Sequence, residues 1–91
     1  MSSPTSIIQI WCDNDRQFIE TVRPVIAYDQ QKHRGQTEYI TGDVADWLVF
    51  YFNARQEKID GPYCTLLQYA LDQVDYRELA EHLIRRQEEY E

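Results

Sequence analysis

The side chains of this 91-residue chain that could form a tetrahedral zinc site are two cysteines and two histidines. Cys12, His33, Cys64 and His82 are separated from one another by 18 residues or more. Structural zinc sites usually take their ligands from close pairs, such as Cys-x-x-Cys or His-x-x-x-His. The spacing therefore predicts no metal site, and we expect both thiols in the core and both imidazoles at the surface.

Paired carboxylates offer a second kind of chemistry. A di-metal helical bundle needs Glu-x-x-His pairs on two helices, whereas Glu78 and His82 are four residues apart and form one such pair only. Asp43 and Asp46 could act as a general acid and base. A place in the first turn of a helix explains them more simply, because carboxylates there interact favourably with the helix dipole.

Nucleophilic and phosphate-binding motifs are missing from the sequence. The serines are Ser2, Ser3 and Ser6, all near the start of the chain. The chain contains no Gly-x-Ser-x-Gly, P-loop, Gly-x-Gly-x-x-Gly or His-Glu-x-x-His pattern. Three glycines leave little material for a loop that cradles phosphate. We predict a protein that is not an enzyme and that binds no cofactor.

The charge of the chain restricts its partners. Sixteen acidic and nine basic residues give a net charge of −7, which repels phosphate backbones and anionic membranes. The longest apolar run, Trp47–Phe52, is far shorter than the roughly 20 residues of a membrane span. The N-terminal residues lack the basic and apolar regions of a signal peptide. We expect a cytoplasmic protein with no direct nucleic-acid contact and no membrane contact.

Composition and periodicity predict one all-α domain over residues 1–91, a bundle of about four helices. Three glycines and three prolines are too few for an all-β domain rich in turns. Residues 1–6 are expected to form a flexible tail. In Ser6–Cys12, apolar residues alternate in a way that suits a short extended segment, although the same residues could form the first turns of a helix.

The first two helices are predicted from apolar spacing and caps. One is expected from Asp15 to Gln31, kinked near Arg23 because Pro24 removes a backbone hydrogen bond. Thr41 is a candidate N-cap for the next helix, which is expected to run to about Ile59.

The last two helices carry clearer signals. A helix starting at Pro62 is expected to bury one apolar stripe. The stripe consists of Tyr63, Leu66, Leu67, Ala70, Leu71 and Val74. Asp75 and Glu78 have the spacing of a capping box, and Val74 and Leu79 have that of a hydrophobic staple, so a final helix is predicted after Asp75.

The run "DWLVFYF" (46–52) holds more apolar residues than one buried helix face needs. A helical wheel places six of the apolar residues in this helix on one broad face. These are Val44, Trp47, Leu48, Tyr51, Phe52 and Ile59. Val49 and Phe50 fall outside that face. A strand is the alternative, but it would need burial on both sides and the chain offers few partner strands.

The segment "LLQYALDQVDYRELAEHLI" (Leu66–Ile84) resembles part of small accessory proteins of bacteria, their phages and plasmids. The resemblance covers about a fifth of the chain. It implies an accessory protein of a mobile element and brings no established activity with it.

Two functions are compatible with these features. The first is a small acidic interaction or regulatory protein that binds a partner protein, or itself as a homodimer, through aromatic helical surface. The residues expected to bind are Val49, Phe50, Tyr69 and Tyr90. The alternative is a phage- or plasmid-encoded inhibitor of the anti-restriction or anti-CRISPR type. Such an inhibitor would mimic nucleic acid and occupy the nucleic-acid site of a basic host defence protein. Its acidic residues would be Asp72, Glu78, Glu81, Glu88 and Glu89.

Overall fold

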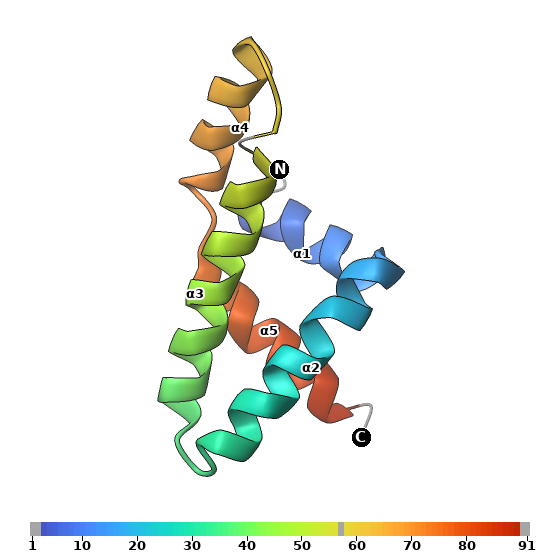
Figure 1. The fold of residues 1–91 in the computed structure, drawn as a ribbon, viewed down its shortest axis with the longest axis vertical. Coiled ribbons are helices and arrows are strands. Elements are labelled where there is room, and N and C mark those ends of the chain that lie inside the picture. The colour runs from blue at the N-terminus through green and yellow to red at the C-terminus, as the bar shows by residue number, and fades with distance from the viewer. Residues whose placement is uncertain (1–2, 57, 90–91) are drawn as a thin grey trace.

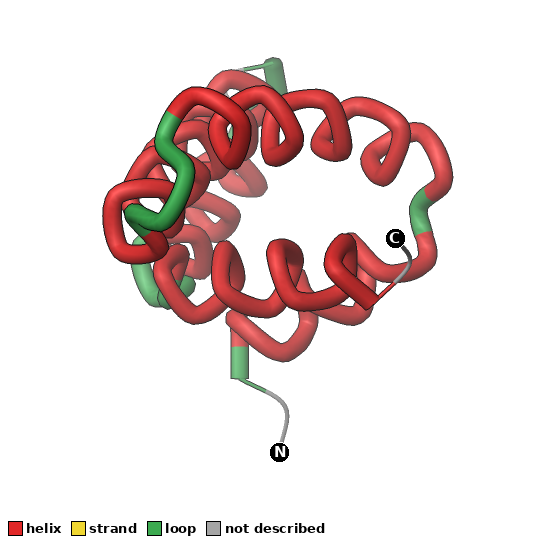
Figure 2. The backbone as a smooth tube through the Cα atoms, turned by 90° about the horizontal axis from the view of Figure 1, so that it is seen from below, coloured by secondary structure: helices red, strands yellow, loops and turns green. Residues whose placement is uncertain are grey.

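A computed structural model describes residues 3–56 and 58–89, and within them every regular element is a helix (Figures 1 and 2). The helices are α1 (Pro4–Asn14), α2 (Arg16–Lys32), α3 (Thr37–Gln56), α4 (Pro62–Leu71) and α5 (Tyr76–Glu89). The prediction of an all-α fold is confirmed, with five described helices where about four were expected. None of these helices is both long enough and apolar enough to cross a membrane.

The additional helix is α1. The Ser3 side chain accepts a hydrogen bond from the Ser6 backbone N–H at 3.1 Å, and Pro4 occupies the first turn. A serine cap followed by proline is a favourable helix start, because proline has no N–H to leave unpaired. The extended alternative for Ser6–Cys12 is therefore wrong. Residues 4–6, expected in the flexible tail, belong to this helix, and residues 1–2 lie outside the described part.

A single residue, Asp15, forms the corner between α1 and α2. Its backbone N–H donates to the Trp11 carbonyl at 2.9 Å, which closes the end of α1. Its side chain accepts from the Phe18 N–H at 2.7 Å, which caps the start of α2. The predicted start of this helix is thus confirmed to within one residue, and α2 continues through Pro24.

Helix α3 begins at Thr37, four residues before the predicted cap, and ends at Gln56 rather than near Ile59. Thr41 is buried inside the helix, and its hydroxyl donates to the Thr37 carbonyl at 2.9 Å. Asp43 consequently lies beyond the first turn. Its carboxylate is too far along the helix for the macrodipole to explain it, because that effect is confined to the first turn.

The core lies between α3 and α5, with α2 and α1 packed against them. Its buried apolar residues come from every helix. They are Cys12, Phe18, Val22, Ile26, Ile40, Val44, Leu48, Phe52, Leu71, Val74, Leu79, Ala80, Leu83 and Ile84. Phe18 is fully buried, and its ring lies 5.4 Å from the Trp11 ring and 6.0 Å from the Phe52 ring. This aromatic contact fastens α1, α2 and α3 together.

The start of α5 is tied to α1 by a long-range hydrogen bond. Asp75 caps the helix as predicted, because its Oδ1 accepts from the Glu78 N–H at 3.0 Å. The second hydrogen bond of the expected capping box has a different acceptor. The Asp75 N–H donates to Thr5 Oγ1 at 2.8 Å, so a side chain from α1 replaces that of Glu78. Val74 and Leu79 are both buried, as the predicted staple requires.

The molecule is elongated, with principal extents of 43 × 23 × 22 Å. Its radius of gyration is 13.6 Å, compared with about 12 Å expected for a globular chain of this length. The reason is visible in Figure 1, where α4 and the C-terminal half of α3 project beyond the body formed by the other helices. Helix α4 packs mainly on α3.

We predict that Thr5→Val lowers the free energy of unfolding by about 1 kcal/mol, because the part-buried Asp75 N–H loses its acceptor while the side-chain volume stays almost constant. Urea denaturation measures the change. Thr21→Val is the matched control, since Thr21 is exposed and bonds only within α2; a change within about 0.5 kcal/mol is expected for it. Equal losses in the two variants would contradict the role assigned to Thr5.

Candidate protein-binding surface

The aromatic run of α3 divides into three parts in the structure. Leu48 and Phe52 are buried in the core. Trp47 and Tyr51 stack on one another at 5.1 Å and both contact Phe18 of α2, with centroid distances of 6.4 and 5.3 Å. These four residues thus lie on the face that the helical wheel assigned to the core.

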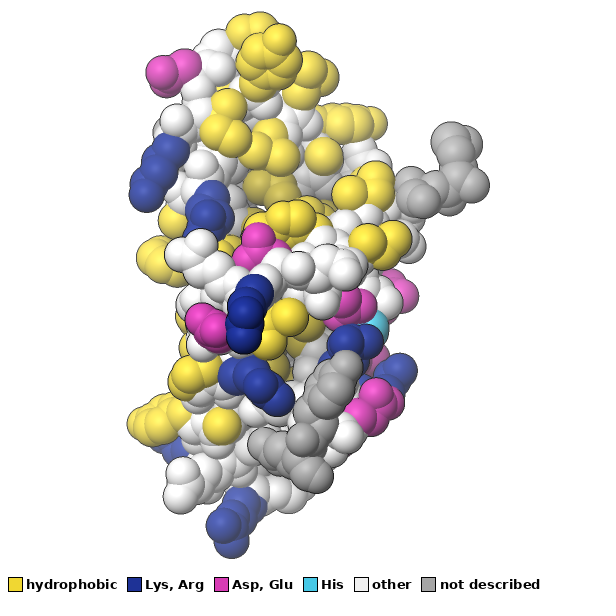
Figure 3. All heavy atoms as spheres, turned by 90° about the vertical axis from the view of Figure 1, so that its right-hand side faces the viewer, with side chains coloured by type: hydrophobic (Ala, Val, Ile, Leu, Met, Phe, Trp, Pro, Cys, Tyr) yellow, Lys and Arg dark blue, Asp and Glu magenta, His cyan; other side chains and the backbone are white. Residues whose placement is uncertain are grey.

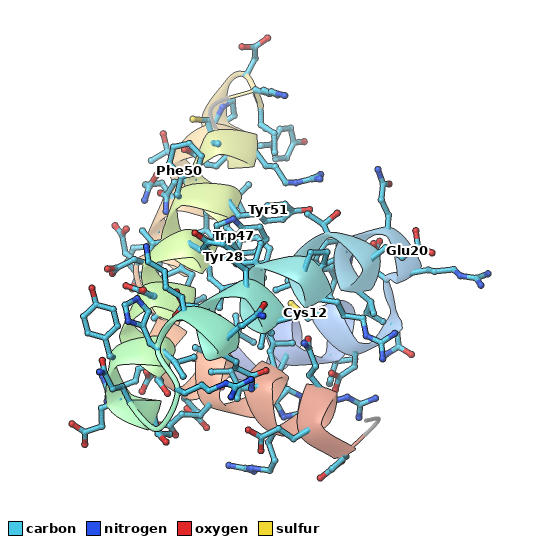
Figure 4. The ribbon with its side chains drawn as sticks, turned by 60° about the horizontal axis from the view of Figure 1, so that its bottom comes forward. Cys12, Glu20, Tyr28, Trp47, Phe50 and Tyr51 are labelled. Atoms are coloured by element: carbon cyan, nitrogen blue, oxygen red, sulfur yellow. The ribbon has the colours of Figure 1, made fainter. Side chains whose placement is uncertain are left out.

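Val49 and Phe50 are the third part. Val49 is 39% exposed and Phe50 is 73% exposed, so the described helices do not cover the Phe50 ring. In Figure 4, Phe50 lies on the side of α3 away from Trp47 and Tyr51, which are directed towards α2. An apolar ring held in water on a rigid helix is a candidate contact point for another molecule.

Helix α4 exposes more apolar surface than its sequence predicted. Leu67 and Leu71 face the rest of the protein, as expected. Tyr63, Leu66 and Tyr69, spaced at i, i+3 and i+6, are 70, 65 and 70% exposed. The placement of Tyr63 and Leu66 on the buried stripe is therefore wrong. The stripe is wider than α3 can cover, because α4 has few neighbours besides α3.

Together these side chains form what we term the tip surface. It consists of Val49, Phe50, Ile59, Tyr63, Leu66 and Tyr69. Figure 3 views the molecule from the right of Figure 1, away from the side on which Phe50 lies in Figure 4. There too hydrophobic side chains gather over the projecting end, whereas charged side chains are frequent nearer the other end. Val49, Phe50 and Tyr69 were predicted as binding residues. Ile59, Tyr63 and Leu66 were instead expected on buried faces of their helices. Tyr90 lies outside the described residues.

The tip surface is large for a monomeric protein. Three aromatic side chains exposed by about 70% leave roughly 100–175 Å² each in contact with water, given the 150–250 Å² that such side chains can bury. Their summed exposed area is comparable to that of the largest apolar patch of a typical monomer, about 300–600 Å². The whole chain exposes 6442 Å², whereas a compact monomer of 10.9 kDa is expected to expose about 5,600 Å².

The acidic residues proposed for mimicry do not form a purely acidic face. Asp72 lies at the end of α4, while the other four lie on α5, and all five are exposed. The four are Glu78, Glu81, Glu88 and Glu89. Arg77 pairs with Glu81 at 3.8 Å, and Arg85 is exposed on the same helix. This mixture of signs weakens the negative potential that a nucleic-acid mimic requires.

The cysteines and histidines have separate surroundings. Cys12 is fully buried, and Cys64 is half-buried with its Sγ 2.6 Å from the Gln56 amide nitrogen. His82 contacts Asp13 at 3.0 Å through Nε2 and Gln9 at 3.1 Å through Nδ1. This imidazole holds α5 against α1 and is only partly exposed, contrary to the expected surface position.

The remaining histidine belongs to a cluster. His33 at the end of α2 lies close to Asp29 on the same helix and to Asp43 on α3, and one potential ligand atom from each lies within 4.8 Å of the others. Burial raises the pKa of Asp29, and the adjacent Asp43 carboxyl raises it further, against the opposing effects of His33 and Lys32. This group was not predicted from the sequence, although Asp29 and His33 have the i, i+4 spacing of one helical turn.

Comparison of the chain with protein-family models, with curated proteins and with solved structures finds no match.

We predict that the two thiols differ strongly in reactivity. Burial, aided by the nearby carboxylates of Asp13 and Asp15, raises the pKa of Cys12 to about 12, so only about one molecule in 10⁴ carries its thiolate at pH 8. Titration of the native protein with a chromogenic disulfide at pH 8 should modify Cys64 first. A Cys64→Ser variant should react only after unfolding in urea, whereas Cys12→Ser should react in the native state. Rapid modification of native Cys64→Ser protein would show that Cys12 is accessible.

Proposed function

We propose that the protein is a non-enzymatic interaction protein that forms a homodimer through the tip surface. The observation that carries this proposal is the outward face of α4, where Tyr63, Leu66 and Tyr69 stand in water on a helix supported mainly by α3. Tyrosine combines a large apolar area with a polar tip and loses little conformational entropy on binding, which suits it to interfaces.

The charge of this region favours a second copy of the chain over a basic partner. Residues 49–72 contain two basic and three acidic residues, so they carry −1 of the total charge of −7. Two nearly neutral surfaces approach without strong repulsion. Exposed basic and acidic residues, Lys58 and Asp60, lie beside each other between α3 and α4, and a two-fold axis would let each face its opposite in the partner copy.

The available area supports the same conclusion. The surface of the chain exceeds the expectation for a compact monomer by roughly 800 Å², which equals about one side of a standard protein interface. A two-fold axis near Leu66 would bring the α4 helices of two copies together. Burying the α4 face in this way would bring the exposed surface area of each copy close to the area expected for a compact protein of its mass.

The experiment is to measure molar mass by size-exclusion chromatography with light scattering at protein concentrations from about 1 μM to 1 mM. The wild type is expected to be a dimer over the upper part of this range. Tyr69→Glu places an uncompensated charge in the interface and is expected to cost about 2 kcal/mol or more, hence at least a 30-fold weaker dimer.

Tyr28→Glu is the matched control. Tyr28 is a helical tyrosine that is 64% exposed but lies on α2, outside the tip surface, so this variant makes the same chemical change and should dimerise like the wild type. Phe50→Glu then shows whether the interface extends from α4 onto the outer side of α3. A wild type that remains monomeric at 1 mM, or a Tyr69→Glu dimer as tight as the wild type, would refute the proposal.

A further inference from the structure

The cluster at the α2–α3 turn has the ligand types of a metal site. Asp29 and His33 are one helical turn apart, so their side chains project from the same face of α2. Asp43 approaches from α3, and its Oδ2 lies 4.0 Å from His33 Nε2. The His33 ring packs on Tyr39 with a centroid distance of 4.3 Å, which restrains its orientation.

A second observation concerns the burial of Asp29. This residue is only 9% exposed, and its Oδ2 is buried with no hydrogen-bond partner among the described residues. A buried carboxylate oxygen without a donor is costly, since it has lost its water and gained no replacement. The neighbouring Asp43 carboxyl raises the pKa of Asp29 through a side-chain hydrogen bond as well as through its charge. A divalent cation bound between the two carboxyl groups would replace the shared proton and offset their repulsion.

We propose that Asp29, His33 and Asp43 form a binding site for a divalent transition-metal ion of the zinc class. One imidazole nitrogen with two carboxylate oxygens suits zinc or manganese, whereas magnesium prefers oxygen ligands alone. Metal–ligand bonds of about 2.0–2.2 Å place ligand atoms roughly 3.2–3.5 Å apart. The His33 Nε2 and Asp43 Oδ2 atoms are 4.0 Å apart, so they have to approach each other by less than about 1 Å to reach that separation. The Asp43 side chain is 41% exposed and has room to rotate.

The site opens onto a groove between α2 and α3 with a volume of about 440 Å³. Its lining residues are Pro24, Val25, Tyr28, Asp29, Asp43, Val44 and Trp47. Tyr28 and Trp47 mark the groove in Figure 4, one on each helix. Three protein ligands leave at least one coordination position of the metal free, and the groove gives water or a small anionic ligand access to it.

The test is calorimetric titration of the full chain, freed of metal with EDTA, with zinc chloride at pH 7.5. We expect one ion per chain, a rise in Tm with zinc that EDTA reverses, and no binding of magnesium. Asp43→Asn and His33→Gln should each weaken zinc binding about 10- to 100-fold or more.

Asp46→Asn is the matched control, because Asp46 is an exposed carboxylate one turn further along α3 and its change alters the net charge equally. It should bind zinc like the wild type. If the wild type shows neither heat nor a Tm shift, the proposal is wrong. Zinc binding that is equally strong in Asp43→Asn and Asp46→Asn would place the ion elsewhere and also refute it.

Discussion

The buried ring of Phe18 is the contact on which the arrangement of the helices depends. It touches Trp11 of α1 and Trp47, Tyr51 and Phe52 of α3, so a single side chain of α2 joins three helices. Edge-to-face and offset aromatic pairs of this kind stabilise by about 0.5–1.5 kcal/mol each beyond the area they bury. Because Phe18 lies one turn after the Asp15 corner, the corner and the ring together fix the direction in which α2 crosses α3.

This arrangement leaves the last part of α3 beyond the reach of α2. Past Phe52 the helix continues to Gln56 and is accompanied mainly by α4. Gln56 bridges the two helices, since its amide nitrogen donates to the Cys64 carbonyl at 3.2 Å. Two helices alone cannot enclose a core, because each can cover only one side of the other. The exposed aromatic residues of the tip surface are thus a consequence of helix placement as well as of composition.

The sequence allowed prediction of those features that depend on near neighbours in the chain. The caps at Asp15 and Asp75 were predictable because a short acidic side chain bonds to an N–H three residues ahead. Which side of α4 is covered was not predictable, since that depends on how many helices reach it. The start of α3 was placed too late because Thr41 resembles a cap, although its hydroxyl can equally bond within a helix. The cluster of Asp29, His33 and Asp43 was not predictable, because it depends on how the turn between α2 and α3 places the two helices against each other.

The two ends of α3 carry surfaces of different charge, which affects how two copies of the chain would associate. The helix is 20 residues long, hence about 30 Å from end to end. Its first half carries Asp43, and its second half carries Val49 and Phe50, the part of the nearly neutral tip surface that lies on α3. Residues 49–72 carry only −1 of the total charge of −7, whereas the rest of the chain carries −6, and repulsion between net charges extends over a Debye length of about 8 Å at physiological salt. Approach tip to tip avoids this repulsion, and the charge distribution therefore favours the same pairing as the apolar surface does.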